Sequence, residues 1–273
     1  MKYQTFAPHP DLSDFVKCYW TLEVPIEINP EKQRAIADGY IEMIFHLADD
    51  VKSYTDEEGY TLQPRSMILG HPIKPFFFEP TGNVDTFAVR FRPYGLANLI
   101  KKPIKELTDK VLPLNEVFDE DFSQKATQQI NQAINTQQRI TVIEKLLFEK
   151  FNQKETLDYI VKNTIDALIA SNGNSSVNTL LKNNVSQRRQ LERKFTDKIG
   201  LSPKQLGKVI RLQTALRRLL NHPSEKLYHI AYDSDYYDQA HFIRDFKEFT
   251  GISPKTFWQD KSMEVASFIY SKD

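Results

Sequence analysis

The 273-residue chain has few of the residues that build several common kinds of site. Its one cysteine, Cys18, cannot form an intrachain disulfide and excludes CxxC metal or redox motifs. Among its nine glycines, no two lie closer than Gly200 and Gly207, so neither G-x-G-x-x-G nor the P-loop pattern is present. The standard phosphate cradles of ATP- and NAD-dependent enzymes are therefore excluded.

Long apolar runs are missing as well. No stretch of about 18 apolar residues is present, and the first residues are polar rather than the apolar core of a secretion signal. We therefore expect a cytoplasmic protein with no membrane partner. The length predicts two domains, each large enough for its own core.

The formal net charge of zero conceals an uneven distribution. Residues 1–155 contain 18 basic and 23 acidic residues, a charge of −5, whereas residues 156–273 contain 18 and 13, a charge of +5. Within the second half, residues 182–218 contain eleven basic and two acidic residues, a local charge of +9. The neutral total thus combines an acidic half with a basic half that suits a polyanionic partner.

The first half has the pattern of short strands. Aromatic and β-branched segments alternate with turn residues, which is typical of an antiparallel barrel or sandwich. The segments that we expect to be strands are residues 15–24, 40–47, 67–69, 75–78 and 86–91. The pattern predicts a domain over residues 1–152 that is mostly β to about residue 93 and then helical. Residues 153–273 should form an all-α domain.

The second half contains an internal repeat. Residues 191–204 match residues 242–255 at an offset of 51, with six of 14 positions identical. Such self-similarity indicates a duplicated supersecondary unit. In each copy a helix ends at a glycine suited to a left-handed cap, and a Ser-Pro pair then begins the next segment.

Each copy predicts a helix-turn-helix. In the second, residues 227–233 form a short helix, and Asp238 caps a helix over residues 239–250. The first places a short helix at residues 177–182, a turn at Asn183-Asn184 and a longer helix at residues 186–199. The two units therefore cover about residues 176–200 and 226–251.

A helix capped by Ser202-Pro203 and running to about Asn221 should join the two units. At about 1.5 Å per residue, it is roughly 28 Å long. Two recognition helices at its ends could enter successive major grooves, which repeat every ~34 Å.

These residues resemble a known family. Ile230-Ala231, Tyr236 and the segment Asp238-Gln239-Ala240-His241-Phe242 with Arg244, Phe246 and Gly251 to Pro254 are similar to the signature of AraC/XylS transcriptional regulators. Asp235 stands where the family usually has glycine, and Ala240 where it has a small hydroxyl residue. The serine of the first unit, Ser186, lies five rather than four residues before Leu191, which leaves the rotation of that helix open by about one residue.

The resemblance implies a bacterial, sequence-specific DNA-binding regulator, activator or repressor, that is not an enzyme and needs no cofactor. Its partner would be double-stranded DNA; further partners to test are a small-molecule effector, RNA polymerase and a second copy of the chain. By position in the motif, the following residues would contact DNA: Arg188, Arg189, Gln190, Arg193, Lys194, Lys198, Gln239, His241, Arg244 and Lys247. Arginine suits guanine and glutamine suits adenine, whereas the lysines should meet phosphates. Gln187 is an alternative if the first helix starts differently.

The first half indicates less about chemistry. It resembles, more loosely, a regulatory domain attached to some of these regulators, through Cys18-Tyr19-Trp20, Ala37-Asp38-Gly39 and Val89-Arg90-Phe91. Weak candidates for an effector site are Trp20, Tyr40, Phe77 and Arg90, although aromatic residues at strand spacing are more often core. The histidines lack metal-ligand spacing, and no catalytic set is evident, so we expect no metal and no catalytic residue. Two alternatives remain open: a barrel enzyme tethered to DNA by the helical domain, and a DNA-bound scaffold without an effector.

Overall fold

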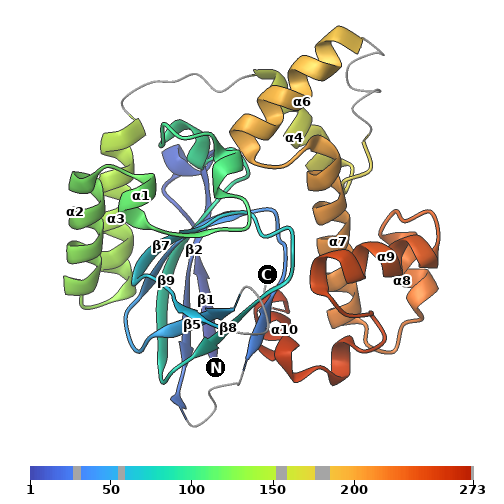
Figure 1. Cartoon of the computed structure of the whole chain (residues 1–273), viewed down its shortest axis with the longest axis horizontal. Helices are drawn as coiled ribbons and strands as arrows, with labels where there is room; N and C mark the ends of the chain where they lie inside the picture. The colour runs from blue at the N-terminus through green and yellow to red at the C-terminus, as the bar shows by residue number, and fades with distance from the viewer. Residues whose placement is uncertain (27–31, 55–58, 152–158, 176–184, 272–273) are drawn as a thin grey trace.

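The computed structural model describes residues 1–26, 32–54, 59–151, 159–175 and 185–271 (Figure 1). The predicted fold class is confirmed: an antiparallel β part with helices comes first, and an all-α part follows. Within the described residues, no helix is long and apolar enough to cross a membrane. Across the described ranges the expected strands and helices are found, together with further strands, among them β1 (Lys2–Phe6) and β5 (Val51–Tyr54), that the pattern did not predict.

Two antiparallel sheets form the N-terminal part. The larger has the order β1-β2-β9-β4-β7-β10 and the smaller the order β3-β8-β5-β6. The strands of the larger sheet are β1 Lys2–Phe6, β2 Val16–Val24, β9 Val84–Phe91, β4 Ile41–His46, β7 Ser66–Leu69 and β10 Val111–Pro113. Those of the smaller are β3 Gln33–Ala35, β8 Phe76–Pro80, β5 Val51–Tyr54 and β6 Thr61–Leu62.

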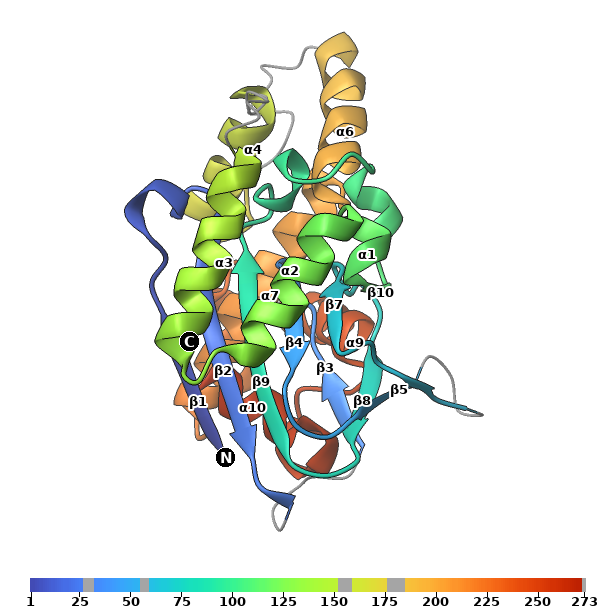
Figure 2. The ribbon, with the colours of Figure 1, turned by 90° about the vertical axis from the view of Figure 1, so that its left-hand side faces the viewer.

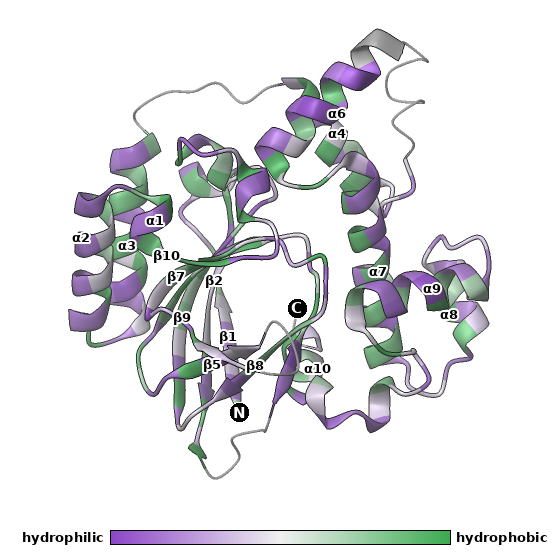
Figure 3. Ribbon diagram, viewed as in Figure 1, coloured by the Kyte–Doolittle hydropathy of each residue, from purple (hydrophilic) through white to green (hydrophobic). Residues whose placement is uncertain are grey.

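Both faces of the larger sheet are covered, which explains why β4 is buried along its whole length. Helices α2 (Glu120–Gln132) and α3 (Thr136–Phe151) lie across one face (Figure 2). Because side chains alternate along a strand, Phe87 and Val89 pack on these helices, whereas Thr86, Ala88 and Arg90 face the other way. The outer helix α2 is largely hydrophilic on its solvent side (Figure 3). The short elements η1 (Pro10–Leu12), η3 (Leu96–Asn98), η4 (Ile104–Leu107) and α1 (Leu114–Val117) complete this part.

The long helix α7 (Pro203–Asn221) organises the C-terminal part. It begins at a capping box, in which the Ser202 hydroxyl accepts from the Gln205 backbone and the Gln205 side chain accepts from the Ser202 backbone. Its neighbours are α4 (Tyr159–Ala170) and α6 (Val185–Ile199) on one side, and α8 (Leu227–Asp233) and α9 (Gln239–Thr250) on the other. The expected short helix at residues 177–182, its turn at Asn183-Asn184 and the expected domain boundary at 152 lie outside the described residues.

The terminations of the two long helices follow the repeat. Gly200 after α6 and Gly251 after α9 have φ of +84° and +75°, the left-handed conformation that glycine adopts without strain. Asp238 caps α9, since its carboxylate accepts from the His241 backbone at 2.7 Å. Asp235 adopts φ of +60° in the turn before it, as expected for a residue in place of glycine.

The two parts are joined by a seam, which we define as the loop from Gln33 to Gly39 and the residues that it contacts. The Gln213 amide on α7 donates to the Ala37 carbonyl at 2.5 Å, and Ile36 and Ala37 pack in the α7–α9 core. Gln33 donates to the Lys261 carbonyl at 3.1 Å and accepts from the Val265 backbone at 3.0 Å. The last elements of the chain are η5 (Phe257–Gln259), η6 (Lys261–Met263) and α10 (Glu264–Tyr270). The contacts of Gln33 hold η6 and α10 against the smaller sheet.

A second contact joins the parts near the end of α6. Lys105 pairs with Asp197 at 2.6 Å, and the Thr108 hydroxyl donates to the Gly200 carbonyl at 3.0 Å. His71 is 1% exposed beside the Ile199 backbone. Burial lowers the pKa of His71 to about 4, a shift that its interaction with the Ile199 backbone opposes.

We therefore predict that acidification weakens folding through His71. A histidine with a pKa near 6.5 unfolded and about 4 folded is neutral in both states above pH 7, and the unfolded state takes up a proton first as the pH falls. Its contribution should lower the free energy of unfolding by about 1 kcal/mol between pH 7 and pH 5.5. In urea unfolding, the free energy of unfolding of H71L should fall by about 1 kcal/mol less than that of the wild type between pH 7 and pH 5.5. The exposed control H222N should match the wild type, and equal pH dependence in H71L would contradict the assignment.

Candidate nucleic-acid interface and cavity

Helix α6 presents an exposed basic face. Leu191 and Phe195 are buried and lie one turn apart, so they mark the inward face of the helix. The opposite face is directed to solvent. Arg189 and Arg193, also one turn apart, are exposed. Arg188 is exposed as well and pairs with Glu192 at 3.0 Å, which leaves Glu192 engaged with its own helix.

The other predicted residues of α6 differ in exposure. Gln190 and Lys198 are exposed, whereas Lys194 is half-buried. The helix begins at Val185, one residue before the expected start, and the side chain of Gln187 lies outside the described part. The predicted bases of α6 are therefore brought together along one helix.

Helix α9 presents a second exposed set. Gln239, Arg244 and Lys247 are exposed, and the buried Phe242 and Phe246 fix their orientation. His241 is less available, because its side chain is 34% exposed, its ring lies edge-on to Tyr236 at 5.2 Å, and its Nε2 lies 3.5 Å from Asp245. The structure thus places His241 beside the core of the unit, with Arg244 and Lys247 more fully in solvent.

Asp245 orients α9 against α7, a role that the sequence did not reveal. This carboxylate is 1% exposed and lies 3.2 Å from the Lys208 ammonium and 3.9 Å from the Arg211 guanidinium. Glu248 also binds Lys208, at 2.8 Å. Lys208 therefore holds the two helices together. The sequence position could have indicated that Asp245 is buried, because it lies between Phe242 and Phe246, which both face inward on α9.

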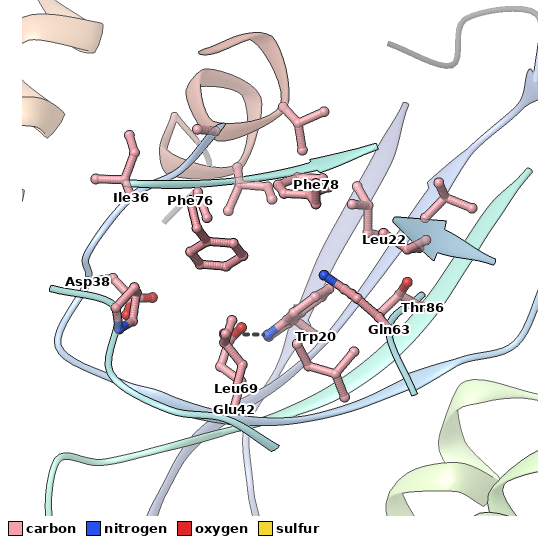
Figure 4. Close-up of a pocket in the computed structure, with 18 of the residues that line it drawn as sticks. Trp20, Leu22, Ile36, Asp38, Glu42, Gln63, Leu69, Phe76, Phe78 and Thr86 are labelled. Atoms are coloured by element: carbon pink, nitrogen blue, oxygen red, sulfur yellow. Dashed lines mark hydrogen bonds between the residues drawn. The ribbon is translucent and has the colours of Figure 1, made fainter. Parts of the chain in front are cut away.

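The N-terminal part contains a cavity of about 160 Å³ between the larger sheet, the smaller sheet and α10. Trp20, Tyr40 and Arg90, three of the four weak candidates for an effector site, line it. Phe77 does not line it: on β8 the alternation turns Phe76 and Phe78 inward (Figure 4), and the Phe77 ring lies 4.4 Å from the Arg34 guanidinium.

The polar end of the cavity is a buried network. The carboxylate of Glu42 accepts from the Trp20 indole at 2.9 Å (Figure 4). It also accepts from the Arg90 guanidinium at 2.8 Å. Glu42 and Arg90 are direct cross-strand partners on β4 and β9, so the register itself sets this pair side by side. Arg90 also lies 3.8 Å from Asp38 and 5.6 Å from the Tyr40 ring centroid. Burial raises the pKa of Tyr40, which keeps its hydroxyl neutral.

No group of three or more metal-ligating side chains occurs in the part of the chain that the structure describes. His46 binds Gln63 at 3.0 Å, and burial lowers its pKa, so it is neutral near pH 7. Glu79 binds Lys52 at 2.9 Å and Tyr54 at 2.5 Å. His46 and Glu79 are thus engaged in internal hydrogen bonds.

Two family models match parts of the chain. Residues 4–113 match a family described as a domain of unknown function (DUF6597), and residues 184–260 match the helix-turn-helix domain family. No curated protein matches the chain significantly. The second match covers α6 to α9, the elements that carry the exposed bases.

Several solved structures similar to the chain are of ToxT from Vibrio cholerae. One has 14% identity and a TM-score of 0.47, covering 94% of this chain and 98% of that chain. ToxT bound to (E)-4-(8-methylnaphthalen-1-yl)but-3-enoic acid has 13% identity and a TM-score of 0.49, covering 99% and 100%. ToxT bound to an unsaturated fatty acid has 14% identity and a TM-score of 0.46, covering 87% and 92%.

We predict different effects for two exposed residues of α9. R244A should weaken binding to a selected DNA site by about 1–3 kcal/mol and change binding to random DNA much less, because a base contact is lost. K247A should weaken both about equally and lower the salt slope by about one, as a phosphate contact does. Fluorescence anisotropy across a salt series distinguishes the two. An equal loss on both DNAs for R244A would exclude it as a base contact.

Proposed function

We propose that this chain, whose C-terminal half carries a helix-turn-helix domain of the AraC/XylS type, is a DNA-binding transcription regulator that inserts α6 and α9 into successive major grooves. The observation that carries the proposal is the attachment of both helices to α7, each with its basic face exposed. The N-terminal part would control this binding. Contacts with RNA polymerase and with a second copy of the chain stay predictions.

The length of α7 supports the two-groove arrangement. Its 19 residues correspond to roughly 28 Å. With the added width of the flanking helices, α6 and α9 can lie near the ~34 Å that separates major grooves on one face of a duplex. Single-groove binding would leave one of the two basic faces without a partner.

The roles on each helix follow from side-chain chemistry and exposure. Arg189 and Arg193 would contact bases from α6, with Gln190 beside them, and Arg188 is the alternative if the helix is rotated. On α9, Arg244 and Gln239 would contact bases, with His241 next to them. Lys194, Lys198 and Lys247 would bind phosphates and set the register on the duplex.

Control by the N-terminal part is supported by the seam. The loop that bounds the cavity, from Arg34 to Asp38, is bonded to α7 through its own Ala37 and to α10 through the adjacent Gln33. A molecule that enters the cavity would therefore contact the loop that is bonded to α7, the helix against which α9 packs. We propose that such an effector changes DNA affinity by shifting the population of docked and undocked states.

Paired arginine substitutions test the proposal. R189A/R193A should reduce affinity for a duplex selected from a random library by at least ~30-fold, about 2 kcal/mol, because two groove contacts are lost. The control K101A/K102A removes the same charge from two exposed lysines of the N-terminal part and should stay within twofold. Anisotropy with the full chain measures both. Equal effects of the two variants would contradict the proposal and indicate charge attraction alone.

A further inference from the structure

The charged groups that line the cavity are already paired with opposite charges within the protein. Arg90 lies between Glu42 and Asp38, at 2.8 and 3.8 Å. Arg34, the other arginine of the lining, pairs with Asp260 at 3.7 Å and lies over Phe77. Among the described residues that line it there is no lysine, and His46 is neutral near pH 7.

We propose that the cavity binds a small, uncharged and mainly apolar molecule, held between the larger sheet and α10. This inference rests on the proposed function, for which that molecule would be the effector. It names the chemical class of the ligand and the wall that closes over it.

The size and lining favour such a ligand. A dry apolar cavity of about 150 Å³ is large enough for benzene, so 160 Å³ suits a molecule of about one ring with a short substituent. Most of its surface is apolar, and Leu22, Ile44, Met67, Phe76 and Phe78 are among the residues that line it. Figure 4 shows Phe76 and the Trp20–Glu42 pair on opposite sides of the space.

An ionic ligand would meet opposing charges. A carboxylate that approaches Arg90 also approaches Glu42 and Asp38, and like charges in a mainly apolar site repel each other. An ammonium that approaches either acid meets Arg90 in the same way. A hydroxyl group loses less hydration on entry and finds the Glu42 carboxylate as an acceptor.

Helix α10 is part of the site rather than a neighbour of it. Val265, Ala266, Ile269 and Tyr270 line the cavity, although they lie more than 170 residues beyond the last lining residue of the sheets, Arg90. The Tyr270 hydroxyl donates to the Ile36 carbonyl at 3.3 Å, which fixes the helix over the opening between the sheets. Ligand binding therefore requires the C-terminal end of the chain.

Three matched probes test the ligand class with the full chain at pH 7: 2-phenylethanol, phenylacetate and 2-phenylethylammonium. Titration calorimetry, together with Trp20 fluorescence in a W258F background, should show the alcohol binding at least tenfold more tightly than either ion. Phenylacetate or the ammonium binding as tightly as the alcohol would overturn the proposal. Absence of binding by all three would overturn it as well.

Two variants test the location. A266F fills the cavity from α10 and should weaken alcohol binding at least tenfold, whereas S271F adds the same ring at an exposed position and should stay within twofold. E42Q removes one of the acids beside Arg90 and should raise the affinity for phenylacetate relative to the alcohol at least fivefold. Unchanged alcohol binding in a folded A266F, or an unchanged ratio in E42Q, would contradict the site.

DNA binding measured on the same samples separates the two proposals. A chain that binds its selected duplex but prefers phenylacetate overturns the ligand class alone. A chain that binds the alcohol in this cavity but no DNA overturns the proposed function and leaves the ligand class standing.

Discussion

The buried face of α7 is the constraint on which the rest of the structure depends. Leu206 lies in the core with α4 and α6, Leu216 and Leu219 lie in the core with α8 and α9, and Gln213 between them binds the Ala37 carbonyl of the N-terminal part. One continuous helix thus sets the separation of the two helix-turn-helix units and receives the contact from the cavity loop. Because α7 is one continuous helix of 19 residues, we expect a displacement of the cavity loop or of either helix-turn-helix unit to move the other elements that α7 contacts.

Burial and charge are divided between the halves in a way that fits this arrangement. The acidic N-terminal half covers one face of its large sheet with its own helices and uses its internal charges in pairs such as Arg90 with Glu42. The basic half leaves Arg189, Arg193 and Arg244 exposed, while the bases that bind other helices, such as Lys208, are engaged. The net charge of the whole chain describes neither half, because the acidic excess of the first half cancels the basic excess of the second.

Local signals in the sequence predicted the C-terminal helices closely. The repeat, the Ser202-Pro203 start and the glycines at 200 and 251 specify ends of helices through backbone chemistry, so the bounds of α7, α8 and α9 agree with expectation. Alternation of apolar residues likewise predicted β2, β4, β7, β8 and β9, but it missed β1 and β5 as well as the two- and three-residue strands, which are held in place by pairing more than by propensity. Three consecutive phenylalanines do not indicate which of them face the inside of β8, so the sequence could not show that Phe76 and Phe78 line the cavity and Phe77 does not. The seam could not be foreseen either, because Gln213 and Ala37 lie 176 residues apart and meet only in the folded chain.

Hydroxyl-radical footprinting of the full chain on a selected duplex tests the central role of α7 most directly. Two helices held at the ends of a rigid connector should protect two patches on one face of the DNA, with centres about 10 base pairs apart. Inserting residues between α6 and α7 should abolish one patch and leave the other. A single patch in the wild type, or two patches on opposite faces of the duplex, would contradict the account.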